Sequence, residues 1–164
     1  MFSDRLINIA LLVSDDARQK RLRIATAESC TGGLLASLFT ELAGSSAVFD
    51  RGFVTYSNHS KQEVLNVPGD MIADFGAVSE AVARSMAEGA LEACRANIAI
   101  AITGIAGPGG GTPLKPVGTV HIACARENRA ILHEMHSFGD IGRRNVREET
   151  LIVALNLITQ QIAS

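Results

Sequence analysis

The chain has 164 residues, a length that fits one domain with a sizeable core. Apolar residues make up 47% of it, yet it contains no Trp, one Tyr and six Phe. The core must therefore be aliphatic and rich in Ala, which favours an α/β domain over a β-sandwich. The net charge is -2 and there is no basic run, which argues against broad nucleic-acid binding.

Hydrophobic periodicity predicts the secondary structure. In chain order, we expect a helix over about 3–19, a strand over 22–28, a helix over 32–43, a strand over 48–56, helices over 58–66 and 79–94, strands over 97–103, 117–125 and 130–138, and a helix over 142–163. Strands that alternate with helices predict a three-layer α/β/α fold. A short connection near residues 127–128 predicts a hairpin, so the sheet should be mixed, although mostly parallel. No repeat or linker divides residues 1–164, so we expect a single domain.

The N-terminal apolar stretch, residues 7–13, is too short to span a membrane and has acidic residues on both sides. It predicts one face of an amphipathic helix and is a candidate surface for a homo-oligomer. Because no basic leader precedes it, we expect a cytoplasmic protein. Cys30, Cys94 and Cys124 form neither a disulfide framework nor a zinc-ligand spacing. We therefore expect no metal and no cofactor.

The turn over residues 29–33 is the most informative local feature. A buried-strand pattern ends there and a helix pattern begins, which places hydroxyl groups, a thiol and free backbone N–H groups at a positive helix end. Such a place suits attack on a carbonyl, stabilisation of an oxyanion or binding of a phosphate. Plain N-capping by Ser29 or Thr31 would account for the same residues.

Ser29 and Cys30 are the candidate nucleophiles in this turn. Tyr56 and Lys61 follow the second strand and would emerge at the same sheet edge, where Lys61 can activate a hydroxyl if its pKa is lowered. A solvated Lys61 and an edge Tyr56 are the alternative. A thiol at a helix N-terminus has a depressed pKa, but Cys30 has no evident His partner. On that ground, and on the resemblance described below, we rank Ser29 above Cys30.

Residues 103–116 form a loop between two core strands and contain five glycines and three prolines. The loop has neither the P-loop nor the Rossmann spacing. It should nevertheless emerge with the Ser29 turn at the carboxyl ends of the strands, where α/β sheets bind ligands. At the start of the last helix, Arg143 and Arg147 lie one turn apart and are placed to clamp a phosphate. Salt bridges to Glu148 and Glu149, or a subunit contact, are the alternative.

Together these stretches resemble the CinA C-terminal domain family, whose members are nicotinamide-nucleotide amidases. The matching stretches are residues 26–33, 54–58 with Lys61, 76–79, 103–110, 117–120, and Arg143 with Val146 and Arg147. The resemblance implies an α/β/α fold without a metal, and hydrolysis of nicotinamide mononucleotide to nicotinate mononucleotide and ammonia. It also implies that Ser29 is the nucleophile and that Tyr56 and Lys61 activate it. The family's usual Gly-Asp-Arg run is interrupted here, since Ile141 and Gly142 precede Arg143.

The expected partner is thus a small-molecule pyridine nucleotide, with no nucleic acid and no membrane. Backbone N–H groups of residues 30–33 would hold the oxyanion, the loop and the two arginines would surround the ribose phosphate, and Glu28 would orient Lys61 or bind the ribose. The predicted substrate-binding residues are Glu28, Cys30, Thr31, Gly32, Gly33, Thr103, Gly104, Gly107, Gly109, Arg143 and Arg147. The alternative function is a non-catalytic nucleotide-binding module, which does not need Ser29, Tyr56 and Lys61 to converge.

Overall fold

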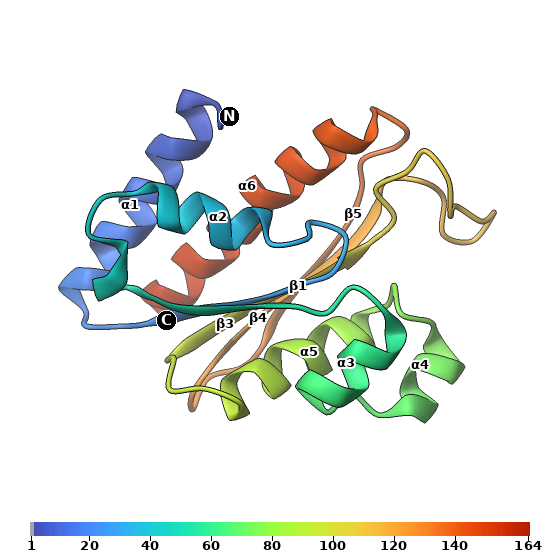
Figure 1. The fold of residues 1–164 in the computed structure, drawn as a ribbon, viewed down its shortest axis with the longest axis horizontal. Coiled ribbons are helices and arrows are strands. Elements are labelled where there is room, and N and C mark those ends of the chain that lie inside the picture. Colours follow the sequence, from blue (N-terminus) through green and yellow to red (C-terminus); the bar gives the residue numbers. More distant parts are fainter. Residues whose placement is uncertain (1) are drawn as a thin grey trace.

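The computed structural model describes residues 2–164, and Figure 1 shows helices on both sides of one twisted sheet. The elements are α1 (Asp4–Gln19), β1 (Ile24–Glu28), α2 (Leu34–Glu41), a short 3-10 helix (Ser45–Ala47), β2 (Phe49–Val54), α3 (Asn58–Leu65), α4 (Gly69–Phe75), α5 (Glu80–Glu92), β3 (Ile98–Gly104), β4 (Thr119–Arg126), β5 (Leu132–Ser137) and α6 (Arg143–Ala163).

The sheet has five strands in the order β2-β1-β3-β4-β5. Strands β2, β1 and β3 are parallel, whereas β4 runs antiparallel to both β3 and β5. Four of the five strands therefore share one direction. The predicted α/β fold with a mixed, mostly parallel sheet is confirmed, and the hairpin near residues 127–128 is present as a turn in which Arg129 N donates to Arg126 O at 3.1 Å.

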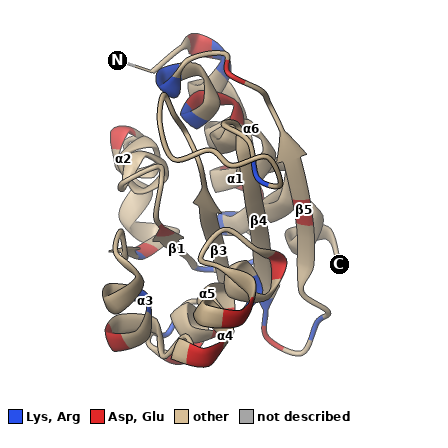
Figure 2. Ribbon diagram, turned by 90° about the vertical axis from the view of Figure 1, so that its right-hand side faces the viewer, with Lys and Arg blue, Asp and Glu red and all other residues tan. Residues whose placement is uncertain are grey.

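Alternating side chains of the central strand divide the core into two layers. Ile98, Ile100 and Ile102 of β3 pack with buried residues of α1, α2 and α6, whereas Ala99 and Ala101 face α3, α4 and α5. Figure 1 shows the same division, with α1, α2 and α6 on one side of the sheet. Small side chains on the second face permit the close approach of α5. Basic and acidic residues are interspersed along the ribbon (Figure 2).

One helix was not predicted. Helix α4 has seven residues and only Ile72 of them is buried, so its sequence carries no amphipathic period. The second strand ends at Val54 rather than at residue 56. Thr55 N still donates to the carbonyl oxygen of Glu28 at 2.9 Å, and the chain then turns so that Ser57 caps α3. Within residues 2–164, none of the helices has the length and hydropathy needed to cross a bilayer.

Candidate active site

Parallel strands bring three functional segments to one edge of the sheet. Ser29 follows β1, Tyr56 follows β2, and the Gly-rich loop follows β3. Because β2, β1 and β3 are adjacent and parallel, these segments meet at their carboxyl ends, as expected. They line an open cleft of about 270 Å³.

Ser29 and Lys61 are in direct contact in this cleft. Lys61 Nζ lies 2.9 Å from Ser29 Oγ, 2.9 Å from the carbonyl oxygen of Thr55 and 3.3 Å from that of Tyr56. The lysine is 1% exposed and the serine 8% exposed. Three neutral acceptors thus surround a buried amine, and the sequence-based expectation that Ser29 and Lys61 converge agrees with the geometry.

Burial lowers the pKa of Lys61, because a charged amine is poorly solvated there. Among residues 2–164, Lys61 has no carboxylate within ion-pair distance that would stabilise its charged form. The start of α3 holds the side chain in place through a capping box, in which Ser57 and Ser60 exchange backbone-to-hydroxyl hydrogen bonds of 3.0 and 3.1 Å. The arrangement suits a neutral amine that accepts the serine proton.

Tyr56 contacts the pair in a different way from the one expected. Its carbonyl oxygen accepts from Lys61, and Ser29 Oγ lies 3.4 Å from the same oxygen. Tyr56 is 60% exposed, and its phenol oxygen accepts a hydrogen bond from Arg143 Nη2 at 3.1 Å. Arg143 also donates to the carbonyl oxygen of Gly107 at 2.9 Å. The tyrosine hydroxyl therefore lies with Arg143 and does not bond to Ser29 or Lys61.

Most predicted residues of the Gly-rich loop line the cleft. The predicted site residues on its wall are Ser29, Cys30, Tyr56, Lys61, Thr103, Gly104, Gly107, Gly109 and Arg143. Six further lining residues were not assigned to the site from the sequence, namely Asn58, Ala77, Val78, Ile105, Ala106 and Gly110. They fall within the stretches 54–58, 76–79 and 103–110, so family resemblance was the signal that could have identified them. The Thr103 hydroxyl donates to the carbonyl oxygen of Ala77 at 2.8 Å and so links β3 to the stretch 76–79.

The other predicted substrate-binding residues do not line the cleft. The carboxylate of Glu28 is fully buried and accepts from the amides of Gly33, Leu35 and Ala36 at 3.1, 3.0 and 2.9 Å. It neither lines the cleft nor hydrogen-bonds to Lys61. Thr31, Gly32, Gly33 and Arg147 are likewise absent from the cleft wall, and Arg147 Nη2 donates to the carbonyl oxygen of Thr31 at 2.8 Å.

Cys30 differs from the expectation of a depressed thiol pKa. Burial raises the pKa of its thiol to about 11, since a thiolate would be poorly solvated at this position. Helix α2 begins only at Leu34, so the thiol lies outside the first helical turn. A protonated thiol at neutral pH is a weak nucleophile, which counts against Cys30 and in favour of Ser29.

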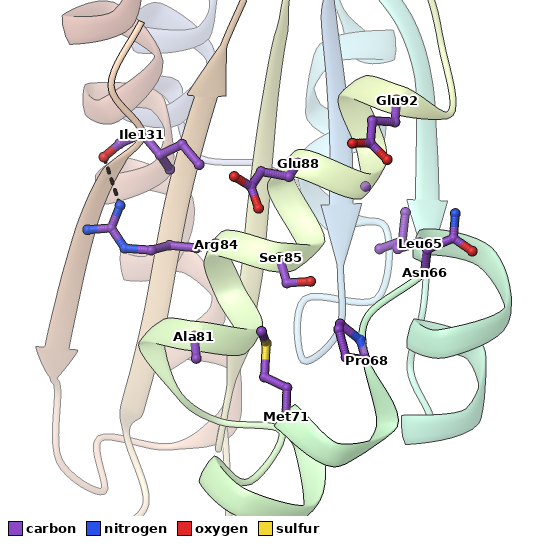
Figure 3. A pocket seen from close by; sticks show the side chains of 11 residues that line it. Leu65, Asn66, Pro68, Met71, Ala81, Arg84, Ser85, Glu88, Glu92 and Ile131 are labelled. Carbon is purple, nitrogen blue, oxygen red and sulfur yellow. Dashed lines mark hydrogen bonds between the residues drawn. The ribbon is translucent and has the colours of Figure 1, made fainter.

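A second, larger hollow of about 450 Å³ lies along α5, between the α3–α4 connection and Ile131 (Figure 3). Glu88 and Glu92 of α5 lie along it, and Arg84 donates to the carbonyl oxygen of Ile131 at 2.9 Å. None of the predicted site residues lines this hollow, and it contains no paired nucleophile and base. Across residues 2–164, no three His, Cys, Asp or Glu side chains are grouped as a metal site. The cleft at Ser29 is therefore the candidate active site.

Solved structures share this fold and its sequence. A competence/damage inducible protein from Agrobacterium tumefaciens superposes with a TM-score of 0.97 at 47% identity, covering 100% of this chain and 99% of that one. A competence-damaged protein (CinA) superfamily protein from Klebsiella pneumoniae gives a TM-score of 0.91 at 34% identity, covering 96% of this chain and 98% of the other.

Curated relatives extend the comparison to longer proteins. A CinA-like protein from Mycobacterium sp. is 52% identical over 85% of this chain and 33% of its own length. A putative competence-damage inducible protein from Caldicellulosiruptor bescii is 45% identical over 88% of this chain and 34% of its own length. The chain thus spans about one third of the length of these relatives. The family model for the CinA C-terminal domain matches residues 7–162, so the chain belongs to the CinA C-terminal domain family.

Proposed function

We propose that the protein hydrolyses the carboxamide of nicotinamide mononucleotide, giving nicotinate mononucleotide and ammonia. The observation that carries this proposal is the 2.9 Å contact between Ser29 Oγ and Lys61 Nζ, in a buried setting without an acidic partner. A serine activated by a neutral lysine is suited to amide hydrolysis, which needs a strong nucleophile and a proton for the leaving amine. The choice of substrate rests on the family resemblance of the sequence motifs, which implies nicotinamide mononucleotide.

In the first half of the reaction, Lys61 Nζ takes the proton of the Ser29 hydroxyl while Oγ attacks the carboxamide carbon. The tetrahedral intermediate carries a negative oxygen that backbone N–H groups of the turn stabilise. It collapses with cleavage of the C–N bond, and the Lys61 ammonium returns its proton to the departing nitrogen, which leaves as ammonia. Ser29 is then acylated and Lys61 is neutral again.

In the second half, water attacks the acyl-enzyme ester. Lys61 takes one proton from the water and returns it to Ser29 Oγ as the ester bond breaks. The product leaves as nicotinate mononucleotide, and the free enzyme is restored. One buried amine, within hydrogen-bond distance of the same oxygen throughout, serves as base and acid in both halves.

The phosphate of the substrate is assigned to Arg143 and the Gly-rich loop. Lys61 and Arg143 are the two basic side chains on the cleft wall formed by the described residues, and only Arg143 is exposed. Its guanidinium lies between the carbonyl oxygen of Gly107 and the hydroxyl of Tyr56, which places a positive charge at the mouth of the cleft. Arg147, which the sequence predicted beside it as a second phosphate ligand, faces the nucleophile turn instead.

Release of ammonia from nicotinamide mononucleotide tests this function. With a chelator present, we expect the native chain to release ammonia. The rate of release by Ser29→Ala should be lower by about a thousandfold or more. Calorimetry should show that this variant still binds the nucleotide. Normal turnover by Ser29→Ala would show that another group is the nucleophile. Nucleotide binding by the native chain without ammonia release would favour the non-catalytic module.

A further inference from the structure

The backbone amides of the nucleophile turn are not equally available. The Glu28 carboxylate accepts from Gly33, Leu35 and Ala36, and Gly32 N donates to the carbonyl oxygen of Ser29 at 3.0 Å. Within residues 2–164, the amides of Cys30 and Thr31 donate to no other residue. The start of α2 is therefore already occupied by an internal anion, and the amides of Cys30 and Thr31 are left without a partner in another described residue.

The carbonyl groups of the turn are also held. The oxygen of Thr31 accepts from Leu34 N at 3.0 Å and from Arg147 Nη2 at 2.8 Å. Arg147 belongs to α6, so the last helix reaches across to the turn that carries Ser29. The Glu28 carboxylate thus accepts from backbone amides at the end of the turn and in α2. Arg147 donates to a carbonyl oxygen within the turn.

These contacts determine the direction of the free amides. A peptide group is planar and trans, so its N–H points opposite to its C=O. The Ser29 carbonyl is held by Gly32 N, and the Cys30 N–H in the same peptide plane must point the other way. Ser29 and Cys30 both line the cleft, so the Cys30 N–H lies at the cleft wall beside the nucleophile. In α/β-hydrolases the backbone N–H of the residue after the nucleophile is one of the oxyanion donors.

We propose that Glu28 and Arg147 are positioning residues, which hold the nucleophile turn so that the Cys30 N–H is aimed at the developing oxyanion. The proposal rests on the proposed function in one respect, namely that Ser29 is the nucleophile. It gives Glu28 and Arg147 a role other than the substrate binding predicted from the sequence. Neither side chain touches the reacting atoms; their contribution is the orientation of the turn.

A fluorophosphonate probe tests the proposal independently of the natural substrate. Ser29 Oγ forms a bond to phosphorus, the P–F bond breaks, fluoride leaves, and the hydroxyl proton passes to Lys61. The phosphoryl oxygen needs the same donors as the oxyanion. The labelling rate at Ser29, located by mass spectrometry, therefore reports on the turn even if nicotinamide mononucleotide is not the substrate.

Glu28→Gln and Arg147→Met are the informative variants. In Glu28→Gln, the side-chain NH₂ group faces at least one of the backbone amides that the carboxylate accepts from. In Arg147→Met, the hydrogen bond to the carbonyl oxygen of Thr31 is lost. We expect labelling and kcat to fall on the order of a hundredfold in each, with KM changed less than about threefold because the Arg143 side of the cleft is intact. Arg147→Lys keeps a cationic donor and should restore part of the rate.

Gln161→Met is the matched control. The Gln161 side chain is buried and donates to the carbonyl oxygens of Cys124 and Ala130 near the β4–β5 hairpin, away from the cleft. We expect it to lower Tm as the other two variants do while labelling at the native rate. Native labelling rates in folded Glu28→Gln and Arg147→Met, or an equal loss in Gln161→Met, would overturn the proposal.

Two results separate this inference from the proposed function. Labelling of the native chain at Ser29 without ammonia release would remove the substrate assignment only, and the variant rates would still decide the role of Glu28 and Arg147. A native chain that neither labels at Ser29 nor releases ammonia would overturn both.

Discussion

At the scale of single residues, Lys61 makes opposite contributions to activity and stability. Its lowered pKa means that the folded state binds a proton more weakly than the unfolded state does, so this group disfavours folding at every pH below the ordinary lysine range. The same lowering supplies the neutral amine that catalysis needs. We expect kcat to rise with pH through the lowered pKa of Lys61 and then to level off.

Lys61→Met separates the two effects. The variant should lose activity by roughly a hundredfold or more, because no base remains. Its Tm at pH 7 should equal or exceed that of the native chain, since an apolar side chain of similar length replaces a buried amine. Ammonia release and a thermal melt at pH 7 measure both quantities. A large fall in Tm together with an unchanged acidic limb of the rate profile would make Lys61 a structural residue.

Tyr56 offers a second test at this scale. Because its hydroxyl contacts Arg143 and its carbonyl oxygen contacts Lys61, removal of the hydroxyl should disturb the phosphate side of the cleft only. We expect Tyr56→Phe to raise KM several-fold and to change kcat less than about threefold, in line with the loss of one exposed hydrogen bond. A hundredfold loss of kcat in steady-state assays would instead support the activating role implied by the family resemblance.

At the scale of elements, hydrophobic periodicity predicted the helices and strands in which apolar residues recur at a regular spacing. It missed the short segments that lack such a spacing. The apolar strand pattern of β3 and the long pattern of α6 were sufficient to predict both elements, because a core-facing period extends over many residues. Helix α4 is too short to show one. Residues 55–56 were predicted to continue the second strand, but β2 ends at Val54 and Ser57 caps α3 directly afterwards.

The candidate site likewise has a part that the sequence predicted and a part that it did not. Its location at the carboxyl ends of β1, β2 and β3 could be predicted, because topology alone brings those ends together. The orientation of single groups could not be predicted. Whether Tyr56 offers its hydroxyl or its carbonyl, and whether Arg147 faces the cleft or the turn, depends on side-chain packing between elements far apart in the sequence. Cys30 shows the same limit, since its burial overrides the effect of a nearby helix end.

At the scale of the whole molecule, a histidine pair joins the sheet to α5. His121 Nδ1 of β4 and His133 Nε2 of β5 lie 3.0 Å apart, and their rings stack at 5.2 Å. His133 Nδ1 also lies 3.6 Å from Glu80, which bonds to Arg84 in the first turns of α5. Burial lowers the pKa of both histidines. The charges of His133 and Lys115 lower the pKa of His121 further, and that of Arg84 lowers the pKa of His133, whereas Glu80 opposes the shift at both histidines and Glu134 opposes it at His133.

The sign of the resulting pH dependence follows from linkage. Below the ordinary histidine range, about 6.5, the unfolded chain binds protons that the folded His121–His133 pair resists, so the free energy of unfolding must fall as pH falls. We expect urea unfolding of the native chain to show this loss between about pH 7 and pH 5, and His133→Asn to show a shallower slope. His59→Asn is the control, because the His59 side chain is 85% exposed on α3 and is not desolvated by folding. Equal slopes for His133→Asn and the native chain would show that other groups dominate the acid sensitivity of the fold.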